Sequence, residues 1–346
     1  MDEDNKIVPE KEQPWQPLLP GELAQAAQAA NEAAARHRFT DYRMRRAEQT
    51  LRRQQADLAL FSEFLAELNL ESGNFAEDPE AWREITWGLV EAFIKWQIQQ
   101  GYALTSINVR LSTIKSYARL AMQAGTLSPQ EYALIRSVQG YSVKEQRRID
   151  QRREQRRLGP KKEEPVLLTP EQAQLLKMQP DTPQGRRDMV MMCLLLDHGL
   201  RVGELAALAV DEIYLSQGLL RFFRPKVNKE QLHRLSRDSL KALQAYKNFG
   251  DMPQNGPLLR RSRKDESLRE TGMTDRAITQ RVNVLGEEIG VLGLSAHDCR
   301  HFWATSAARH GTDPFRLQQA GGWSSLAMPR RYVDDNEISN DGVILE

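Results

Sequence analysis

A strongly basic segment near the middle of the chain, residues 143–162, limits how the sequence can fold. It carries nine Lys or Arg residues against three acidic ones, and it has no apolar stripe for a hydrophobic core to bury. Because charged side chains rarely enter a core, the segment separates the apolar sequence before it from that after it. The length of 346 residues also suits two domains. We therefore predict two domains joined by a basic interdomain linker at residues 143–165.

The first 38 residues are predicted to be a flexible N-terminal extension. Residues 1–20 are polar and contain four prolines, so we expect them to be disordered. Residues 21–36 are rich in alanine and should be helical, although such small side chains bury little area. This segment is predicted to be either a loosely attached helix or an oligomerisation arm.

Residues 39–142 are predicted to form a helical bundle. Apolar residues recur at helical spacing in three segments, which are residues 40–68, 80–100 and 101–125. The side chains expected to cap the first and third helices are Thr40 or Asp41 and Thr105 or Ser106. Gly125 is expected to end the third helix.

Residues 166–346 are predicted to be mostly helical with one small antiparallel sheet. The domain opens with a capping box in which Thr169 is the N-cap, Pro170 is at N1 and Gln172 is at N3. Residues 189–196 are apolar on all sides, as in a fully buried helix, and Gly199 should end that helix. Residues 213–235 contain apolar and aromatic runs around a polar turn, which is typical of strands.

Several protein classes are disfavoured by composition. No apolar run approaches the roughly 20 residues that cross a bilayer. Cys193 and Cys299 lie far apart without metal-ligand spacing, so we interpret both as reduced thiols of a cytoplasmic protein. The net charge is only +1, and any nucleic-acid surface must therefore arise from segregation of charge along the chain.

The most informative motif lies in residues 294–333. His297 and Arg300 are three positions apart and share one helix face, Trp323 follows a Gly-Gly pair, and Tyr332 comes nine positions later. The stretch resembles the catalytic C-terminus of the phage integrase family, or tyrosine recombinases. That family carries His-x-x-Arg, then His or Trp after Gly, then a Tyr nine positions on. The segment QAGGW is similar to that of the Cre-like members, which also carry Trp.

Two upstream motifs extend the resemblance. HGLRVGEL matches the family's first Arg motif and gives Arg201 and Glu204. KVNKEQLHRL matches the hairpin that carries the family's Lys, which gives Lys226, with Lys229 as a rival on the same turn. The match covers about residues 40–333. It implies a mainly α, two-domain DNA clamp, with a helical-bundle core-binding domain and a mostly helical catalytic domain.

The resemblance implies a role for each catalytic residue, and each role has a physical reason. The guanidinium groups of Arg201 and Arg300 can hold phosphate oxygens in bidentate fashion without losing a proton. The ammonium of Lys226 can protonate the leaving 5′ oxygen. Trp323 can donate through its indole N–H but cannot titrate.

The remaining roles concern the nucleophile. Tyr332 would attack to form a 3′-phosphotyrosine, and its phenol is mostly protonated near neutral pH. His297 is therefore the candidate base, and Glu204 would orient a site His or Arg. The other histidines, His301, His310 and His198, are interpreted as structural.

The implied function is site-specific recombination by a homotetramer on double-stranded DNA with inverted-repeat arms around a short spacer. No cofactor and no metal is expected, since no acidic cluster suits Mg²⁺. Alternatives are a type IB topoisomerase-like or hairpin-forming strand transferase, or a catalytically silent DNA-binding regulator. The candidate DNA contacts are Arg43, Arg46, Arg110, Lys115, Arg119, Arg147, Arg148, Arg152 and Arg153. Ile338 and Val343 to Leu345 are predicted to pack on a neighbouring catalytic domain, a frayed end being the alternative.

Overall fold

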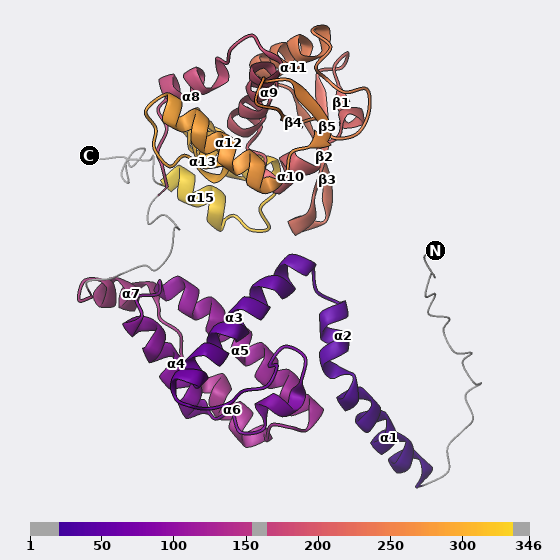
Figure 1. Cartoon of the computed structure of the whole chain (residues 1–346), viewed down its shortest axis with the longest axis vertical. Helices are drawn as coiled ribbons and strands as arrows, with labels where there is room; N and C mark the ends of the chain where they lie inside the picture. The colour runs from indigo at the N-terminus through magenta and orange to yellow at the C-terminus, as the bar shows by residue number, and fades with distance from the viewer. Residues whose placement is uncertain (1–20, 154–164, 335–346) are drawn as a thin grey trace, which may run out of the picture. The chain divides into compact units, whose positions relative to one another are not determined.

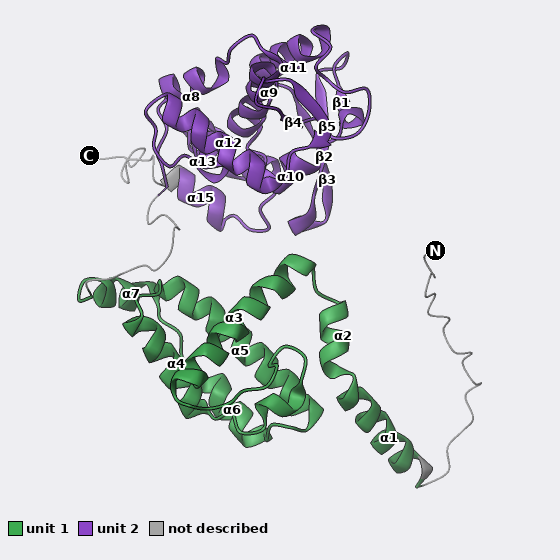
Figure 2. Ribbon diagram, in the orientation of Figure 1, with its two compact units in different colours: residues 1–161 green, residues 162–346 purple. Residues whose placement is uncertain are grey.

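The structure is a computed structural model that describes residues 21–153 and 165–334. It divides into two compact units, residues 1–161 and 162–346, which Figure 2 shows in different colours. The predictions for residues 1–20, for the later part of the basic segment and for the C-terminal Ile338 and Val343 to Leu345 lie outside the described residues. The two units are described separately below.

The described part of the first unit is helical (Figure 1). Its elements are α1 (Glu22–Arg36), α2 (Arg38–Met44), α3 (Glu48–Glu67), the 3₁₀ helix η1 (Pro79–Trp82), α4 (Trp87–Gln99), α5 (Leu104–Ala124), α6 (Pro129–Ser137) and α7 (Val143–Asp150). The predicted helix over residues 21–36 is confirmed by α1, whose side chains are largely exposed.

The core of the first unit surrounds α5 and combines aliphatic side chains with a cluster of aromatic rings. Phe61 lies against Trp82 and Phe93, with ring centroids 6.5 and 5.0 Å away. The helical spacing of apolar residues in 101–125 predicts one buried stripe on this helix, and its five members are all buried on α5: Ile107, Leu111, Ile114, Ala118 and Ala121. Gly125 ends the helix in the left-handed conformation, with φ of 83°.

The predicted caps in this unit are wrong. Thr40 and Asp41 lie inside α2, and α5 begins after Ala103 without a side-chain cap. Packing explains the first error, because Phe39 and Tyr42 of α2 both contact the ring of Tyr117, at 5.8 and 5.6 Å between centroids. These contacts hold residues 38–44 as a separate short helix, against the local capping signal.

The basic segment begins as part of the first unit. A Ser142–Glu145 capping box starts α7, and Ile149 packs against the first unit's core. Arg153 donates a hydrogen bond of 2.8 Å to the Tyr102 carbonyl oxygen. Residues 143–153 are therefore attached to the helical bundle, although no residue of α7 is fully buried, in keeping with the absence of an apolar stripe.

The second unit combines helices with two small sheets (Figure 1). Its helices are α8 (Pro170–Lys177), α9 (Pro183–His198), α10 (Val202–Ala207), α11 (Arg237–Asn248), α12 (Asp275–Glu288), α13 (Ala296–Arg309), α14 (Pro314–Gly321) and α15 (Ala327–Asp334), with 3₁₀ helices η2 (Val210–Glu212) and η3 (Pro225–Val227). Its strands are β1 (Ile213–Tyr214), β2 (Leu219–Arg224), β3 (Lys229–Arg234), β4 (Arg260–Ser262) and β5 (Leu268–Gly272).

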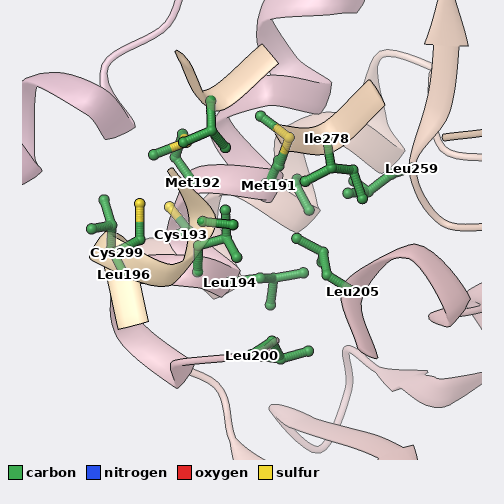
Figure 3. Close-up of a cluster of buried hydrophobic side chains, with 14 of the residues drawn as sticks. Met191, Met192, Cys193, Leu194, Leu196, Leu200, Leu205, Leu259, Ile278 and Cys299 are labelled. Atoms are coloured by element: carbon green, nitrogen blue, oxygen red, sulfur yellow. The ribbon is translucent and has the colours of Figure 1, made fainter. Parts of the chain in front are cut away.

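Helix α9 lies in the core of this unit, and its predicted apolar stretch is buried except at Met189, which is partly buried. Figure 3 shows Met191 and Cys193 of α9 among side chains from other elements, including Leu205, Ile278 and Cys299. All residues from 190 to 196 are buried. The capping box at Thr169 is confirmed, and Gly199 ends α9 with φ of 58°. Burial of residues 190–196 on every side explains why this part of α9 carries no polar side chain.

The sheet prediction was incomplete. Strands β1, β2 and β3 form the predicted antiparallel sheet, with Arg224 paired to Lys229 next to the turn. Strands β4 and β5 form a second antiparallel pair that we did not predict. Their short sequences, RRS and LRETG, contain almost no apolar residues, so they lack the pattern by which strands are recognised.

Among the residues that the structure describes, no helix is long and apolar enough to cross a membrane.

Candidate active site

Arg201 and Glu204 come together because the chain turns sharply between α9 and α10. Gly199 makes the turn, Arg201 takes the N-cap position of α10, and Glu204 lies in its first turn. The backbone N–H of Arg201 donates to Glu204 Oε2 at 2.8 Å, and its guanidinium donates to Oε1 at 2.7 Å. Glu204 is buried, whereas the Arg201 side chain keeps 23% of its surface exposed. Glu204 therefore orients Arg201 while leaving part of its guanidinium accessible.

Arg224 is a further arginine of this cluster, and the sequence analysis did not identify it. It lies at the end of β2, on the same strand face as the buried Leu220 and Phe222, and is itself fully buried. Its guanidinium donates to Glu204 Oε2 at 2.8 Å and to Gln231 of β3. Burial lowers the pKa of Arg224 to about 10, against the opposing attraction of Glu204. Arg224 thus joins the hairpin of β2 and β3 to the carboxylate that orients Arg201.

Arg300 lies on α13 and is also buried. It donates to the carbonyl oxygens of Gly199 and Gly321. Its guanidinium carbon is 4.7 Å from the ring centroid of Trp323. Burial, followed by the nearby charges of Arg201 and Arg224, lowers the pKa of Arg300 to about 9. The site therefore holds this cation at an electrostatic cost.

The end of α14 holds all three arginines. The carbonyl oxygen of Ala320 accepts from Arg224 at 2.7 Å, that of Gly321 accepts from Arg300, and that of Gly322 accepts from Arg201 at 3.3 Å. Carbonyl groups of the last helical turn have no partner within the helix and attract cations. Three consecutive carbonyl groups therefore fix three guanidinium groups that come from α10, β2 and α13.

Glycine is required where α14 ends. Gly322 has φ of 59°, and a Cβ atom there would lie 2.4 Å from Cδ of Arg224. A Cβ atom on Gly321 would lie 2.1 Å from the ring of Trp323. The Gly-Gly pair therefore lets the backbone approach Arg224 and Trp323 closely.

Tyr332 reaches the same region from α15. It is buried and packs with Ala304 and Leu317, and its ring centroid is 5.8 Å from that of Trp323. Its hydroxyl oxygen lies 2.9 Å from Nδ1 of His301. His301 was interpreted as structural, and the structure places it in contact with the predicted nucleophile.

His297 stands one step further from Tyr332 than predicted. Its Nε2 lies 3.1 Å from Nε2 of His301, one helical turn along α13. Desolvation, followed by Arg300, lowers the pKa of His297, and Lys226 and Arg201 contribute. His297 therefore faces the cationic part of the site, and His301 lies between it and Tyr332.

Lys226 and Lys229 are both exposed at the tip of the hairpin of β2 and β3. Lys226 lies in η3 and Lys229 begins β3. Both line an open groove of about 550 Å³ together with Phe315 and Trp323. Lys226 is among the cations that lower the pKa of His297. This proximity favours Lys226 as the residue that serves the site.

The candidate DNA contacts of the first unit fall into two groups. Five have partners within the protein: Arg43 with Glu77, Arg46 with the Tyr42 ring, Arg110 with Gln97, Lys115 with the Val138 carbonyl, and Arg153 with Asp150. Like Arg46, the other four are exposed: Arg119, Arg147, Arg148 and Arg152. Lys115 and Arg119 also line a groove of about 440 Å³ with Arg136. The exposed group is the better placed to meet a polyanion.

Comparisons with known proteins match both units. The model of the phage integrase family matches residues 166–338, and that of the phage integrase N-terminal SAM-like domain matches residues 37–125. Tyrosine recombinase XerD of Proteus mirabilis is 28% identical over 260 residues, which cover 73% of this chain and 75% of that protein.

Two solved structures share the fold. The Tn1549 transposon integrase in complex with transposon right end DNA has a TM-score of 0.60 and 15% identity, over 86% of this chain and 94% of that one. A lambda integrase tetramer bound to a Holliday junction has a TM-score of 0.57 and 14% identity, over 90% and 81%.

Proposed function

Because this chain belongs to the phage integrase family and is a DNA-cleaving and rejoining tyrosine recombinase, we propose that it exchanges strands between two duplex sites through a 3′-phosphotyrosine intermediate. The proposal includes a homotetramer, a Holliday junction, and arms that are inverted repeats around a short spacer. The fold neighbours solved on transposon-end DNA and on a Holliday junction support a DNA substrate. The two-unit clamp around DNA belongs to the same proposal.

The observation that carries the proposal is the set of three arginines held beside a buried tyrosine. Arg201, Arg224 and Arg300 bond to consecutive carbonyl groups, and Arg300 and Tyr332 both contact Trp323. A phosphodiester gains negative charge on its non-bridging oxygens when a fifth oxygen approaches. Fixed guanidinium groups stabilise that charge without reorganising. We assign phosphate binding to Arg201, Arg300 and the Trp323 indole.

The same scheme assigns the proton transfers to side chains of the protein. We assign protonation of the leaving 5′ oxygen to Lys226, because an exposed ammonium on a hairpin tip can move to that oxygen. The phosphotyrosine bond retains the energy of the cleaved phosphodiester bond, so rejoining needs no ATP. Neither does the scheme need a metal, since arginines stabilise the charge and a lysine supplies the proton. Phosphate contacts of the first unit are assigned to Arg119, Arg147, Arg148 and Arg152.

The test is covalent adduct formation on a nicked suicide substrate. The short fragment that carries the freed 5′ hydroxyl diffuses away, so the strand cannot be rejoined and the adduct is trapped. The wild-type chain should give an SDS-resistant protein–DNA adduct. Tyr332→Phe should bind the same DNA in a gel shift and give none, because it removes only the attacking hydroxyl. Adduct formed by Tyr332→Phe at the wild-type rate would refute the nucleophile.

A second assay distinguishes recombination from related strand transfer. A plasmid with two sites should yield exchanged products that depend on both sites. Adduct formation together with relaxation of supercoils on a single site, and without exchange, would favour a topoisomerase-like enzyme. Binding without any adduct would favour a silent regulator.

A further inference from the structure

A chain of hydrogen-bonding groups runs from the nucleophile across one face of α13. The Tyr332 hydroxyl is 2.9 Å from Nδ1 of His301, and Nε2 of His301 is 3.1 Å from Nε2 of His297. The rings meet edge to face, with centroids 5.5 Å apart for Tyr332 and His301 and 4.6 Å for the two histidines. Positions 297 and 301 are four apart, so the helix itself aligns the two imidazoles.

The contacts specify a consistent set of protons. A phenol hydroxyl that donates to Nδ1 of His301 requires a neutral ring with its proton on Nε2. That N–H then donates to Nε2 of His297, whose own proton is on Nδ1. Desolvation and neighbouring groups lower the pKa of both histidines. For His301 these neighbours are His297, Arg331 and Arg300, opposed by Asp298.

We propose, resting on the proposed function, that His301 is a catalytic residue that receives the Tyr332 proton directly and relays it to His297. As the Tyr332 oxygen bonds to phosphorus, its O–H bond breaks and the proton goes to Nδ1 of His301. The Nε2 proton of His301 passes to Nε2 of His297, which becomes an imidazolium. The bond from phosphorus to the 5′ oxygen breaks, and that oxygen takes a proton from Lys226.

The position of His297 couples this relay to substrate. The cations Arg300, Lys226 and Arg201 all disfavour a charged His297, and Asp298 opposes them. A phosphodiester anion bound among these cations offsets their repulsion and favours the imidazolium. Proton transfer from Tyr332 is therefore favoured when a phosphodiester is bound. Without bound DNA, Tyr332 keeps its proton and is not activated as a nucleophile.

His301→Asn tests the relay, because the amide keeps a hydrogen-bonding atom near the position of Nδ1 but cannot accept a proton. His310→Asn is the matched control, since His310 is the C-cap of the same helix and its Nδ1 lies 2.7 Å from the Ser306 carbonyl oxygen, one helical turn away. Loss of a general base lowers rates by about 10²–10⁴-fold. We expect His301→Asn to slow adduct formation on the suicide substrate by about 100-fold or more at pH 7, and His310→Asn to be near wild type.

The pH dependence separates proton transfer from positioning. Below the phenol pKa the ionised fraction rises about tenfold per pH unit. The defect of His301→Asn should therefore shrink as the pH rises from 7 to 9. It should also shrink at pH 7 when Tyr332 is replaced by 3,5-difluorotyrosine, whose phenol is more acidic. A defect that stays constant in both experiments would overturn the relay and leave His301 a positioning residue.

Other outcomes are equally decisive. A wild-type rate in His301→Asn would refute the inference while leaving the proposed function intact, because the wild-type chain still forms adduct. Rescue by pH in His297→Asn but not in His301→Asn would make His297 the direct base. A wild-type chain that forms no adduct would refute the proposed function itself. Gel shifts and thermal melts of His301→Asn and His301→Gln show whether either variant has lost its fold. A variant whose activity is restored at high pH must be folded, so a folding defect cannot explain its low rate at pH 7.

Discussion

Gly322→Ala should destabilise the second unit far more than an alanine at a glycine of similar backbone conformation. Gly322 and Gly311 have φ of 59° and 75°, so either substitution places alanine in the left-handed region. That conformation costs an L-residue roughly 1–2 kcal/mol. The two sites differ in their surroundings. A Cβ atom on Gly311 meets nothing within 4 Å, whereas one on Gly322 lies 2.4 Å from Cδ of Arg224.

The contact with Arg224 sets the size of the difference. Arg224 is fully buried and cannot move aside without leaving Glu204, Gln231 and the Ala320 carbonyl group. Separating a buried ion pair costs about 3–5 kcal/mol. Glu204 would keep Arg201, so we take the lower end of this range. We expect Gly311→Ala to lower the free energy of unfolding by about 1–2 kcal/mol and Gly322→Ala by about 4–5 kcal/mol.

The assay is urea unfolding of the full chain, monitored by hydrogen exchange of the amide groups of α9. These amides lie in the core of the second unit, so unfolding of the first unit does not contribute. In the adduct assay, Gly322→Ala should be impaired at concentrations of urea where Gly311→Ala is active. Equal destabilisation by the two variants would show that Arg224 relaxes freely and that its bonds do not fix the site.

Three further predictions follow from other contacts. Lys226→Ala should slow cleavage of an ordinary 5′ oxygen far more than of a 5′-bridging sulfur, which leaves without a proton, and the same rescue in Lys229→Ala instead would reassign the acid. Thr169→Ala should lower stability by about 0.5–2 kcal/mol, seen as a lower urea midpoint, because it removes the α8 cap; an unchanged midpoint would contradict this. Burial lowers the pKa of His198 to about 4 and that of His233 to about 3, both below the ordinary 6.5. As the pH falls, these histidines are protonated in the unfolded chain before they are protonated in the folded one, which stabilises the unfolded chain. The urea midpoint measured at α9 should therefore be constant above pH 6.5 and fall from there toward pH 4. A midpoint that stays level between pH 7 and 5 would refute this prediction.

Periodicity predicted the helices that bury a face. The stripe on α5 and the apolar length of α9 each reflect burial, and both were read correctly from spacing alone. Caps were less predictable, because Thr40 and Asp41 resemble cap residues but are overridden by the packing of Phe39 on Tyr117. Strands β4 and β5 gave no signal, since neither buries an alternating face.

The candidate site was predictable where residue identity is enough and not where contacts decide. Arg201, Glu204, Arg300, Trp323 and Tyr332 were expected from the resemblance to the motifs of the phage integrase family, and the structure brings them together. Two signals in the sequence were available but unused. Arg224 continues the inward alternation of Leu220 and Phe222 on β2, and His301 lies one helical turn after His297. Arg224 belongs to the site because it contacts Glu204, and His301 because it contacts Tyr332, and in each pair the two residues are distant in sequence.

The choice of acceptors at the end of α14 explains how a cationic site can be built without being neutralised. Three guanidinium groups converge there, yet the carboxylate that pairs with them in the described residues is Glu204, shared by Arg201 and Arg224. Carbonyl groups provide the other bonds, and a carbonyl dipole orients a guanidinium without cancelling its charge. A second carboxylate would fix the arginines equally well, but it would compete with a phosphate for them. Arg300 is held by the carbonyl groups of Gly199 and Gly321, and burial, followed by the charges of Arg201 and Arg224, lowers its pKa although Glu204 opposes this. In the proposed reaction a phosphodiester would bring negative charge beside these guanidinium groups, and relief of their mutual repulsion would favour binding of the group to be cleaved.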